Sequence, residues 1–325
     1  MPRNRYYQGP PSDHFDGTRF FNADGPTEDK ALTDVLRWKW QERAAAWPSE
    51  VPVVPARPDA RVAGVRVTMV GHASLLIQTA GLNLLTDPVW SERASPVSFA
   101  GPKRVTAPGI GFADLPPIDA VLISHCHYDH LDLATLKRLH AAHAPLMVMP
   151  PGNDTIVRSA IPDARIAVGD WGDRVALGEG AATVLTPASH WSARRLGDRR
   201  MALWAGHFVT TAAGSIWFAG DTGYGGGAIF RAIRARHGAP DVALIPIGAY
   251  APRWFMATQH CDPAEAVAIM ADVGAARALG IHWGTFQLTD EPRDEPARGL
   301  VAAVAAAGLA PDRFVAAEVG GVYDF

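Results

Sequence analysis

The chain has 325 residues, of which 48% are hydrophobic and 19% charged, a composition typical of folded globular proteins and not of disordered ones. Its formal net charge of −3 provides no overall basic field, so we do not expect nucleic acid as a partner. The two cysteines, Cys126 and Cys261, are too few for a disulfide framework and indicate a reducing compartment, which predicts a cytoplasmic protein. No apolar segment follows the charged first residues, so no signal peptide is expected.

Residues 1–58 are expected to form an arm, a helix and a connector that pack on the main body. Residues 1–26 are rich in Gly, Pro, Asn and Asp, which indicates an extended or wrapping arm. The next segment predicts a helix over residues 28–46, with an apolar face made of Leu32, Val35, Leu36 and Trp40. The helix carries the aromatic and basic residues Arg37, Trp38, Lys39, Trp40 and Arg43. Such residues suit either packing on the body, which we favour, or peripheral contact with a membrane.

Residues 59–325 predict a single catalytic domain with helices after strands in both halves. The expected strands cover residues 65–70, 74–78, 82–86, 118–125, 146–149, 242–247, 278–282 and 314–319, with short strands in 164–188 and a hairpin in 201–220. The expected helices run from the metal-ligand motif described below to about residue 143 and over 226–237, 263–273 and 294–307. The helix at 263–273 has the clearest signals, because Asp262 and Glu265 match a capping box and Gly274 can end it. This order predicts an α/β protein in which two mixed sheets pack face to face with helices outside.

The hexapeptide His125-Cys126-His127-Tyr128-Asp129-His130 is the most informative segment, since it holds four strong metal-ligand side chains. It lies between an apolar strand and the start of a helix, at the kind of edge where α/β sheets bind ligands. In extended backbone His125 and His127 point the same way, whereas Cys126 faces away and is expected to be a small buried filler. Asp129 and His130 follow after a turn and face a neighbouring position. The segment therefore predicts ligands for two metal ions, for which zinc, manganese and iron are suitable.

Further ligands must come from elsewhere, because a catalytic metal needs at least three protein ligands. Three later loops each place a suitable side chain directly after an apolar strand, and these side chains are His190, Asp221 and His282. Taken alone, each histidine is more often a hydrogen-bonded structural residue, and an aspartate between glycines is usually part of a turn. The setting that the three loops share favours metal binding for all of them.

Segment 124–132 resembles the signature of the metallo-β-lactamase fold superfamily. Other motifs are similar to the N-acyl-phosphatidylethanolamine-hydrolysing phospholipase D family over about residues 30–320, among them Gly71-His72-Ala73-Ser74, Leu85-Thr86-Asp87-Pro88, Gly101-Pro102-Lys103-Arg104, Pro252-Arg253-Trp254-Phe255-Met256 and Ile281-His282-Trp283-Gly284. The resemblance implies an αβ/βα four-layer sandwich with two zinc ions between the sheets. It assigns His125, His127 and His190 to one ion, assigns Asp129, His130 and His282 to the other, and makes Asp221 the bridge.

The expected chemistry is hydrolysis by a hydroxide that two ions about 3.5–4 Å apart share at neutral pH. Three residues then count as catalytic, namely Asp129, Asp221 and His260. Asp129 is also placed to steer the proton of the hydroxide. No serine or cysteine nucleophile is needed, and the sequence has no Gly-x-Ser-x-Gly pattern to provide one. Asp87 is either a hydrogen-bond partner of a ligand histidine or a turn residue before Pro88.

Substrate contacts are expected in segment 250–260. The family likeness implies that His260 reaches the head group or the leaving oxygen, and the alternative is a hydrogen bond at the entry to a helix. Gln259, Tyr250 and Arg253 are candidates for a phosphate-binding wall. Trp254 begins an apolar triplet that would line an acyl groove or belong to the core.

We therefore expect a dinuclear metal-dependent hydrolase that converts N-acyl-phosphatidylethanolamine-like phospholipids to N-acylethanolamine and phosphatidic acid. A lactonase or another hydrolase of a soluble ester would use the same site. An inactive metal-binding scaffold is a further alternative, but all seven ligand positions carry competent side chains. The sequence leaves a homodimer open.

Overall fold

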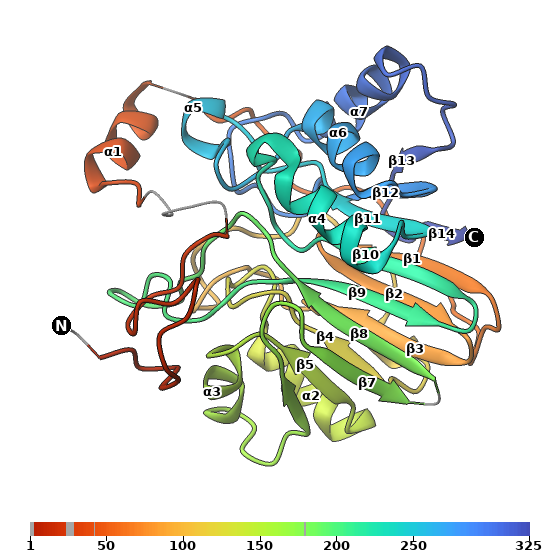
Figure 1. Ribbon diagram of the computed structural model, residues 1–325. Helices are drawn as coiled ribbons and strands as arrows, with labels where there is room; N and C mark the ends of the chain where they lie inside the picture. The colour runs from red at the N-terminus through yellow and green to blue at the C-terminus, as the bar shows by residue number, and fades with distance from the viewer. Residues whose placement is uncertain (1–2, 24–28, 42, 179) are drawn as a thin grey trace.

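Two β-sheets lie face to face between two layers of helices in the computed structural model, which describes residues 3–23, 29–41, 43–178 and 180–325. Figure 1 shows α2 (Leu133–His143) and α3 (Asn153–Arg158) below the sheets. In the same view α4 (Ala228–His237), α6 (Pro263–Val273) and α7 (Glu295–Ala306) lie above them. This arrangement confirms the predicted four-layer α/β sandwich.

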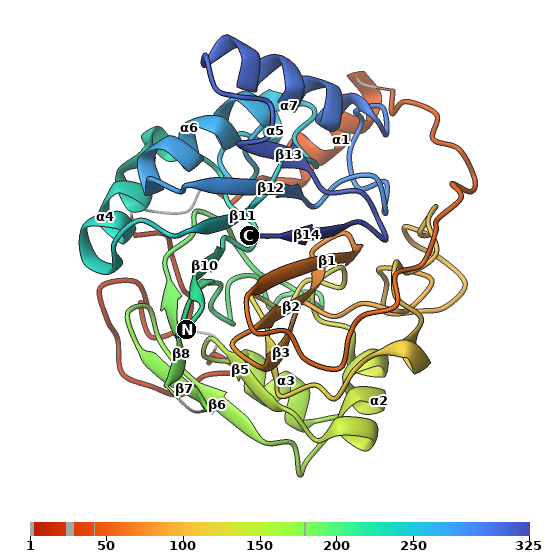
Figure 2. The same ribbon diagram turned by 90° about the vertical axis from the view of Figure 1, so that its right-hand side faces the viewer.

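Each sheet has seven strands within the described part of the chain. The first has the order β14-β1-β2-β3-β4-β5-β6, made of Val322–Asp324, Val65–Gly71, Ser74–Thr79, Leu82–Thr86, Ala120–Leu122, Leu146–Met149 and Ile166–Val168. The second has the order β13-β12-β11-β10-β9-β8-β7, made of Phe314–Ala316, Arg277–Ile281, Val242–Pro246, Gly214–Phe218, Gly206–Thr211, Ala181–Thr186 and Arg174–Gly178. Both are mixed, because β3 to β6 and β10 to β13 run parallel whereas the other pairs are antiparallel. Figure 2 shows the same layers from the side on which the chain ends.

The core is divided by the two sheets into three apolar layers. The central layer joins Val67 and Leu84 of the first sheet to Phe218 and Leu244 of the second. The outer layers pack the helices on the sheets, through Leu136 and Leu139 of α2 on one side and through Phe230, Met270 and Val304 on the other. These side chains are buried on both faces of each sheet, and their burial supplies the main free energy that holds the layers together.

Helix α6 confirms its predicted boundaries of 263–273. The Asp262 carboxylate accepts from the Glu265 backbone N–H at 2.9 Å, and the Glu265 side chain accepts from the Asp262 N–H at 3.1 Å. Gly274 ends the helix in the left-handed conformation at φ 76°. Local sequence signals decide this helix, because all of them lie within the element and its two flanking residues.

The helix predicted over 28–46 is wrong in extent and in its apolar face. Helix α1 covers Leu32–Gln41, and residues 43–46 are not helical. Trp38 is its buried aromatic residue, packed on Phe255 at 4.9 Å between ring centroids, whereas Leu36 and Trp40 are 61% and 87% exposed. Residues 24–28, where the arm ends and the helix was expected to begin, lie outside the described residues, as do the side chains of Leu32 and Lys39.

Five other elements differ from expectation. The strand predicted over 118–125 is confined to Ala120–Leu122, because the chain leaves the sheet to form the loop that carries the histidines. The last predicted strand ends at Ala316 instead of residue 319. Helix α3, the four-residue helix α5 (Arg253–Met256) and strand β14 were not predicted, and each is six residues or shorter. Two 3₁₀ turns, η1 (Phe112–Asp114) and η2 (Gly225–Gly227), complete the described elements.

Residues 3–23 run along the surface beside the loop that follows β8. Phe15 and Phe20 are buried there against Leu203 and Trp204. The amide of Asn4 donates to the Met201 carbonyl at 2.9 Å. The division of the chain at residue 58 stays a prediction. None of the helices in the described residues has the length and apolar character needed to cross a membrane.

Candidate metal centre

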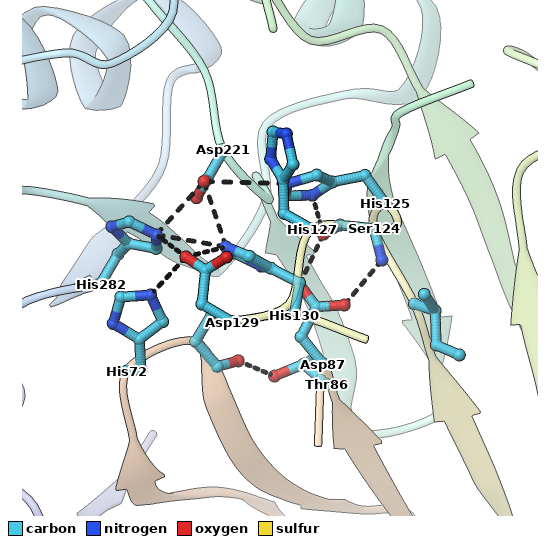
Figure 3. Close-up of polar contacts among 12 residues, drawn as sticks. His72, Thr86, Asp87, Ser124, His125, His127, Asp129, His130, Asp221 and His282 are labelled. Atoms are coloured by element: carbon cyan, nitrogen blue, oxygen red, sulfur yellow. Dashed lines mark hydrogen bonds and ion pairs between the residues drawn. The ribbon is translucent and has the colours of Figure 1, made fainter. Parts of the chain in front are cut away.

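The side chains of the candidate site come from loops at the carboxyl ends of strands in both sheets. Strands β3 and β4 lead into Asp87 and into loop 123–130, and strands β8, β10 and β12 lead into His190, Asp221 and His282. The loop after β4 runs directly into α2, whose first turn is capped by Asp132 through the N–H groups of Ala134 and Thr135. Because both sheets present these ends at one edge, side chains from segments far apart in sequence meet there, such as His130, Asp221 and His282 (Figure 3).

Three imidazoles form a first group, made of His125, His127 and His190. Nε2 of His125 lies 2.8 Å from Nδ1 of His127, and Nε2 of His190 lies 3.3 Å from the same Nδ1 atom. Cys126, between the first two, is 1% exposed and packs in the core on the helix side of the first sheet. His125 and His127 thus lie on one side of the chain and Cys126 on the other, as expected of extended backbone.

A second group consists of Asp129, His130 and His282. Nε2 of His130 lies 3.2 Å from Nε2 of His282. Oδ2 of Asp129 is 3.4 Å from the first of these atoms and 3.5 Å from the second. The backbone N–H of His130 donates to the His127 carbonyl. This hydrogen bond closes the turn between the histidines of the first group and those of the second.

Asp221 lies between the two groups. Its Oδ2 atom is 3.1 and 3.2 Å from Nε2 of His130 and His282, and 3.7 and 4.0 Å from Nε2 of His190 and His125. Gly220 precedes it with a φ of +64°, and a Cβ atom there would meet the Ser124 Cβ at 2.9 Å. Glycine is therefore required for the second sheet to bring Asp221 this close to the histidine loop.

The electrostatics of the cluster leave most of these side chains in the forms that metal ions bind. Burial lowers the pKa of His127 to about 3 and that of His190 to about 4, so both imidazoles are neutral at pH 7. Burial alone would raise the pKa of Asp221 and Asp129, but the neighbouring imidazoles outweigh it and hold both pKa values well below the ordinary value. Neutral imidazoles and ionised carboxylates are the required ligand forms.

The residues also indicate where positive charge is favoured. Burial lowers the pKa of His282, yet Asp221 and Asp129 outweigh burial and raise it to about 9, and they raise the pKa of His130 as well. The pair of carboxylates thus favours positive charge between them, which a cation would supply. Oδ1 of Asp221 is buried without a hydrogen-bond partner among the described residues, as expected of an oxygen reserved for another ligand. The cluster therefore fits a metal site with nitrogen and oxygen ligands.

Buried hydrogen bonds orient two of the candidate ligands, His130 and His190. Oδ2 of Asp87 lies 2.6 Å from Nδ1 of His130, and Oδ1 accepts from the Ser124 backbone N–H at 2.7 Å. Nδ1 of His190 lies 3.0 Å from the Gln259 carbonyl, to which it can donate. These contacts place Asp87 beside the candidate ligand His130, as the first of the two roles considered for it requires, and that role stays a prediction. A partner on the second ring nitrogen fixes the orientation of a ligand histidine.

Two residues of the site were not anticipated from the sequence. Asn22 accepts from the His190 backbone N–H and from the Trp204 indole, both at 3.0 Å, so the N-terminal arm supports the loop of a candidate ligand. His72 lies 3.0 Å from Asp129. A Gly-His pair before a strand could have indicated His72, but nothing in the sequence connects Asn22 with a residue 168 positions away.

The expected substrate residues divide into two sets. His260 is buried with its ring centroid 5.1 Å from that of His190 and 5.5 Å from that of His282, and Gln259 is buried next to it. Tyr250 donates to Glu295 at 2.8 Å, and Arg253 pairs with Glu265 at 2.7 Å. Trp254 is 39% exposed on α5. The polar groups of Tyr250 and Arg253 are thus engaged with acidic residues, and only Gln259 and His260 adjoin the cluster through contacts of the described residues.

Several known proteins are similar to this chain. Residues 82–283 match the family model described as beta-lactamase superfamily domain. An uncharacterised protein of Mycobacterium tuberculosis is 37% identical over 284 residues, which cover 85% of this chain and 75% of that one. N-acyl-phosphatidylethanolamine-hydrolyzing phospholipase D 1 of Caenorhabditis elegans is 37% identical over 245 residues, which cover 71% of this chain and 68% of that one. The mitochondrial enzyme of that name from Saccharomyces cerevisiae is 36% identical over 225 residues, which cover 68% of this chain and 47% of that one.

The solved structure of isothiocyanate hydrolase from Delia radicum gut bacteria is similar in fold, with a TM-score of 0.63 at 22% identity. The match covers 80% of this chain and 99% of that one. At 22% identity it shows the fold alone. The family match covers both groups of candidate ligands. The chain therefore belongs to the beta-lactamase superfamily of metal-dependent hydrolases, in the branch similar to N-acyl-phosphatidylethanolamine-hydrolysing phospholipase D.

Proposed function

We propose that the chain is a phosphodiesterase of phospholipase D type that hydrolyses N-acyl-phosphatidylethanolamine-like phospholipids. The observation that carries the proposal is the position of Asp221, whose Oδ2 atom lies within 4.0 Å of four imidazole nitrogens from both groups. One carboxylate that serves two ligand sets is an arrangement suited to a two-ion phosphodiesterase. The relatives that carry the phospholipase D name support the substrate class.

The proposed ligands follow the two groups. His125, His127 and His190 would hold one ion, and Asp129, His130 and His282 would hold the other. Asp221 would contact both. We propose zinc, with manganese or iron as alternatives for the same nitrogen and oxygen donors. When bound, such a pair supplies a nucleophile from water at neutral pH and offsets charge on phosphoryl oxygens.

His260 is the proposed contact to the substrate. Burial lowers its pKa well below the ordinary value, so its imidazole is neutral at pH 7. Its Nδ1 atom is buried and has no hydrogen-bond partner within the described residues. Arg253 donates to the His260 carbonyl at 2.8 Å and so fixes its backbone, which gives Arg253 a positioning role in place of phosphate binding. A neutral imidazole with an unpaired nitrogen is suited to hydrogen-bond a phosphoryl or leaving oxygen.

The proposed reaction replaces one bond to phosphorus by another. A bond forms between phosphorus and the oxygen of water, and the bond from phosphorus to the oxygen of the N-acylethanolamine breaks. The proton that water loses ends on the departing oxygen. The products are phosphatidic acid and N-acylethanolamine.

The test incubates purified, zinc-loaded protein with mixed micelles of N-acyl-phosphatidylethanolamine in water enriched in ¹⁸O. We expect N-acylethanolamine to be released and one ¹⁸O atom to appear in phosphatidic acid, as measured by mass spectrometry. Asp221→Asn should lower turnover at least about 100-fold, since it removes the charge between the two groups. Asp312→Asn, at an exposed turn, is the matched control and should leave turnover unchanged. Rapid opening of lactones with intact N-acyl-phosphatidylethanolamine would refute the phosphodiesterase and favour the lactonase.

A further inference from the structure

His72 lies in the tight connection between β1 and β2, next to the second group of candidate ligands. Its backbone has a φ of +58°, which is uncommon for a residue other than glycine. Its N–H donates to Oγ1 of Thr285 at 3.0 Å, and its carbonyl accepts from the His282 N–H at 2.8 Å. A residue held by several contacts in a rare conformation is a candidate for a functional role.

The side chain of His72 is directed at Asp129 (Figure 3). Its Nε2 atom lies 3.0 Å from Oδ2 of Asp129, the same oxygen that faces Nε2 of His130 and His282. The ring is 1% exposed and lies 3.9 Å from the ring of His282 between centroids. Of the two carboxylate oxygens of Asp129, His72 therefore contacts the one that faces His130 and His282.

The contact determines which nitrogen of His72 carries the proton. An ionised Asp129 only accepts hydrogen bonds, so the proton must lie on Nε2. Nδ1 is then a lone pair, and it is buried with no hydrogen-bond partner in the described part of the chain. The opposite tautomer would set a lone pair against the carboxylate and leave an N–H group buried and unpaired, which is costly. His72 lies within 4.8 Å of the ligand atoms of Asp129, His130 and His282, but with its proton on Nε2 this nitrogen donates to Asp129 and offers a metal ion no lone pair.

We infer that His72 is a positioning residue of the second metal group, which holds Oδ2 of Asp129 beside His130 and His282. Of the side chains that hydrogen-bond Asp129 in the described residues, it is the one outside the set of seven proposed ligands. The inference rests on the proposed metal centre and is independent of the substrate. Hydrogen-bond partners of ligands typically change metal affinity by 10–100-fold when they are removed.

Two amide substitutions at His72 distinguish the effect of its hydrogen-bond donor from the effect of its ring. In His72→Gln the amide nitrogen takes about the place of Nε2 and can still donate to Asp129. In His72→Asn the amide is too short to reach, while asparagine tolerates positive φ better than other residues. The asparagine variant is therefore the milder change for the backbone and the more severe one for Asp129.

The experiment titrates metal-free protein with Co²⁺ and follows visible absorption, with bound metal counted by elemental analysis. We expect His72→Asn to bind the first ion as the wild type does and the second about 10–100-fold more weakly. His72→Gln should bind the second ion within about threefold of the wild type. Thermal melting of the metal-free variants controls for loss of folding, and His72→Leu replaces His72→Asn if the latter does not fold.

Wild-type affinity for both ions in His72→Asn would refute the inference. Equal loss of the second ion in both amide variants would also refute it, since the ring and not the donor would then matter. A wild-type protein that binds two ions but leaves N-acyl-phosphatidylethanolamine intact would refute the proposed substrate and leave the role of His72 standing.

Discussion

The Oδ2 atom of Asp87 lies 2.6 Å from Nδ1 of His130, and neither side chain has measurable exposure to solvent. The other ring nitrogen of His130, Nε2, faces Asp221 at 3.1 Å. An ionised Asp87 requires a proton on Nδ1, so a cation that takes the place of the second proton would meet the lone pair of Nε2. Asp87 thus determines which form of His130 is available for a metal ion.

Asp87→Asn should weaken binding of the second ion about 10–100-fold. The amide oxygen can still accept from the Ser124 N–H, which directs the amide nitrogen toward His130. His130 then accepts on Nδ1, and its proton moves to Nε2, where it blocks coordination. Co²⁺ titration of the metal-free variant measures the effect, with Asp312→Asn as the control at an exposed aspartate. Unchanged affinity for both ions would contradict this role of Asp87.

The candidate ligands were predictable because the signal for each is local. His125 to His130 are consecutive in a loop after β4, and His190, Asp221 and His282 each follow a strand. Strand ends are read from apolar runs, and the ends of parallel strands meet at one edge. The geometry of the seven residues thus follows from features that single segments carry.

Other parts depend on contacts that no segment reveals. The inward face of α1 is set by Phe255 and Met256, so Trp38 is buried although Leu36 and Trp40 fit a helical stripe equally well. Asn22 and His72 make hydrogen bonds to residues distant in sequence. Arg253 is basic and near His260 in sequence, but Glu265 binds its guanidinium. Charge and spacing cannot show which partner such a side chain finds.

His207 connects the two sheets and should make stability depend on pH. Its Nε2 atom donates to the Ile123 carbonyl at 3.0 Å, just before the histidine loop, and burial lowers its pKa to about 4. The unfolded chain has an ordinary histidine pKa near 6.5. Between these values the unfolded state binds more protons, so stability present above pH 6.5 is lost as pH falls toward 4.

His207→Gln should remove this part of the pH dependence, since glutamine can donate to Ile123 but does not titrate. Urea unfolding of metal-free protein at pH 7 and pH 4.5 gives the loss of unfolding free energy for each variant. We expect the unfolding free energy lost between pH 7 and pH 4.5 to be about 2–3 kcal/mol smaller in His207→Gln than in the wild type. Other buried histidines contribute equally to both proteins, so an identical loss would show that His207 does not titrate as expected.

Helix α1 exposes an apolar surface next to the segment that carries His260. Trp40 is 87% exposed and Leu36 61%, whereas Trp38 packs on α5, which leads to Gln259 and His260. A phospholipid substrate is held in a membrane, and exposed aromatic residues beside basic ones favour the membrane interface. We therefore expect α1 to contact the membrane that presents the substrate.

Trp40→Ala should weaken binding to vesicles that contain N-acyl-phosphatidylethanolamine about 5–30-fold, as expected from about 1–2 kcal/mol of lost apolar burial. Co-sedimentation measures this binding. Val301→Ala is the matched control, because Val301 is 71% exposed on α7. Turnover of a soluble short-chain substrate should be the same in both variants, since neither residue belongs to the metal centre. If both variants bind vesicles as the wild type does, α1 does not contact the membrane, and access to a lipid substrate must depend on another surface.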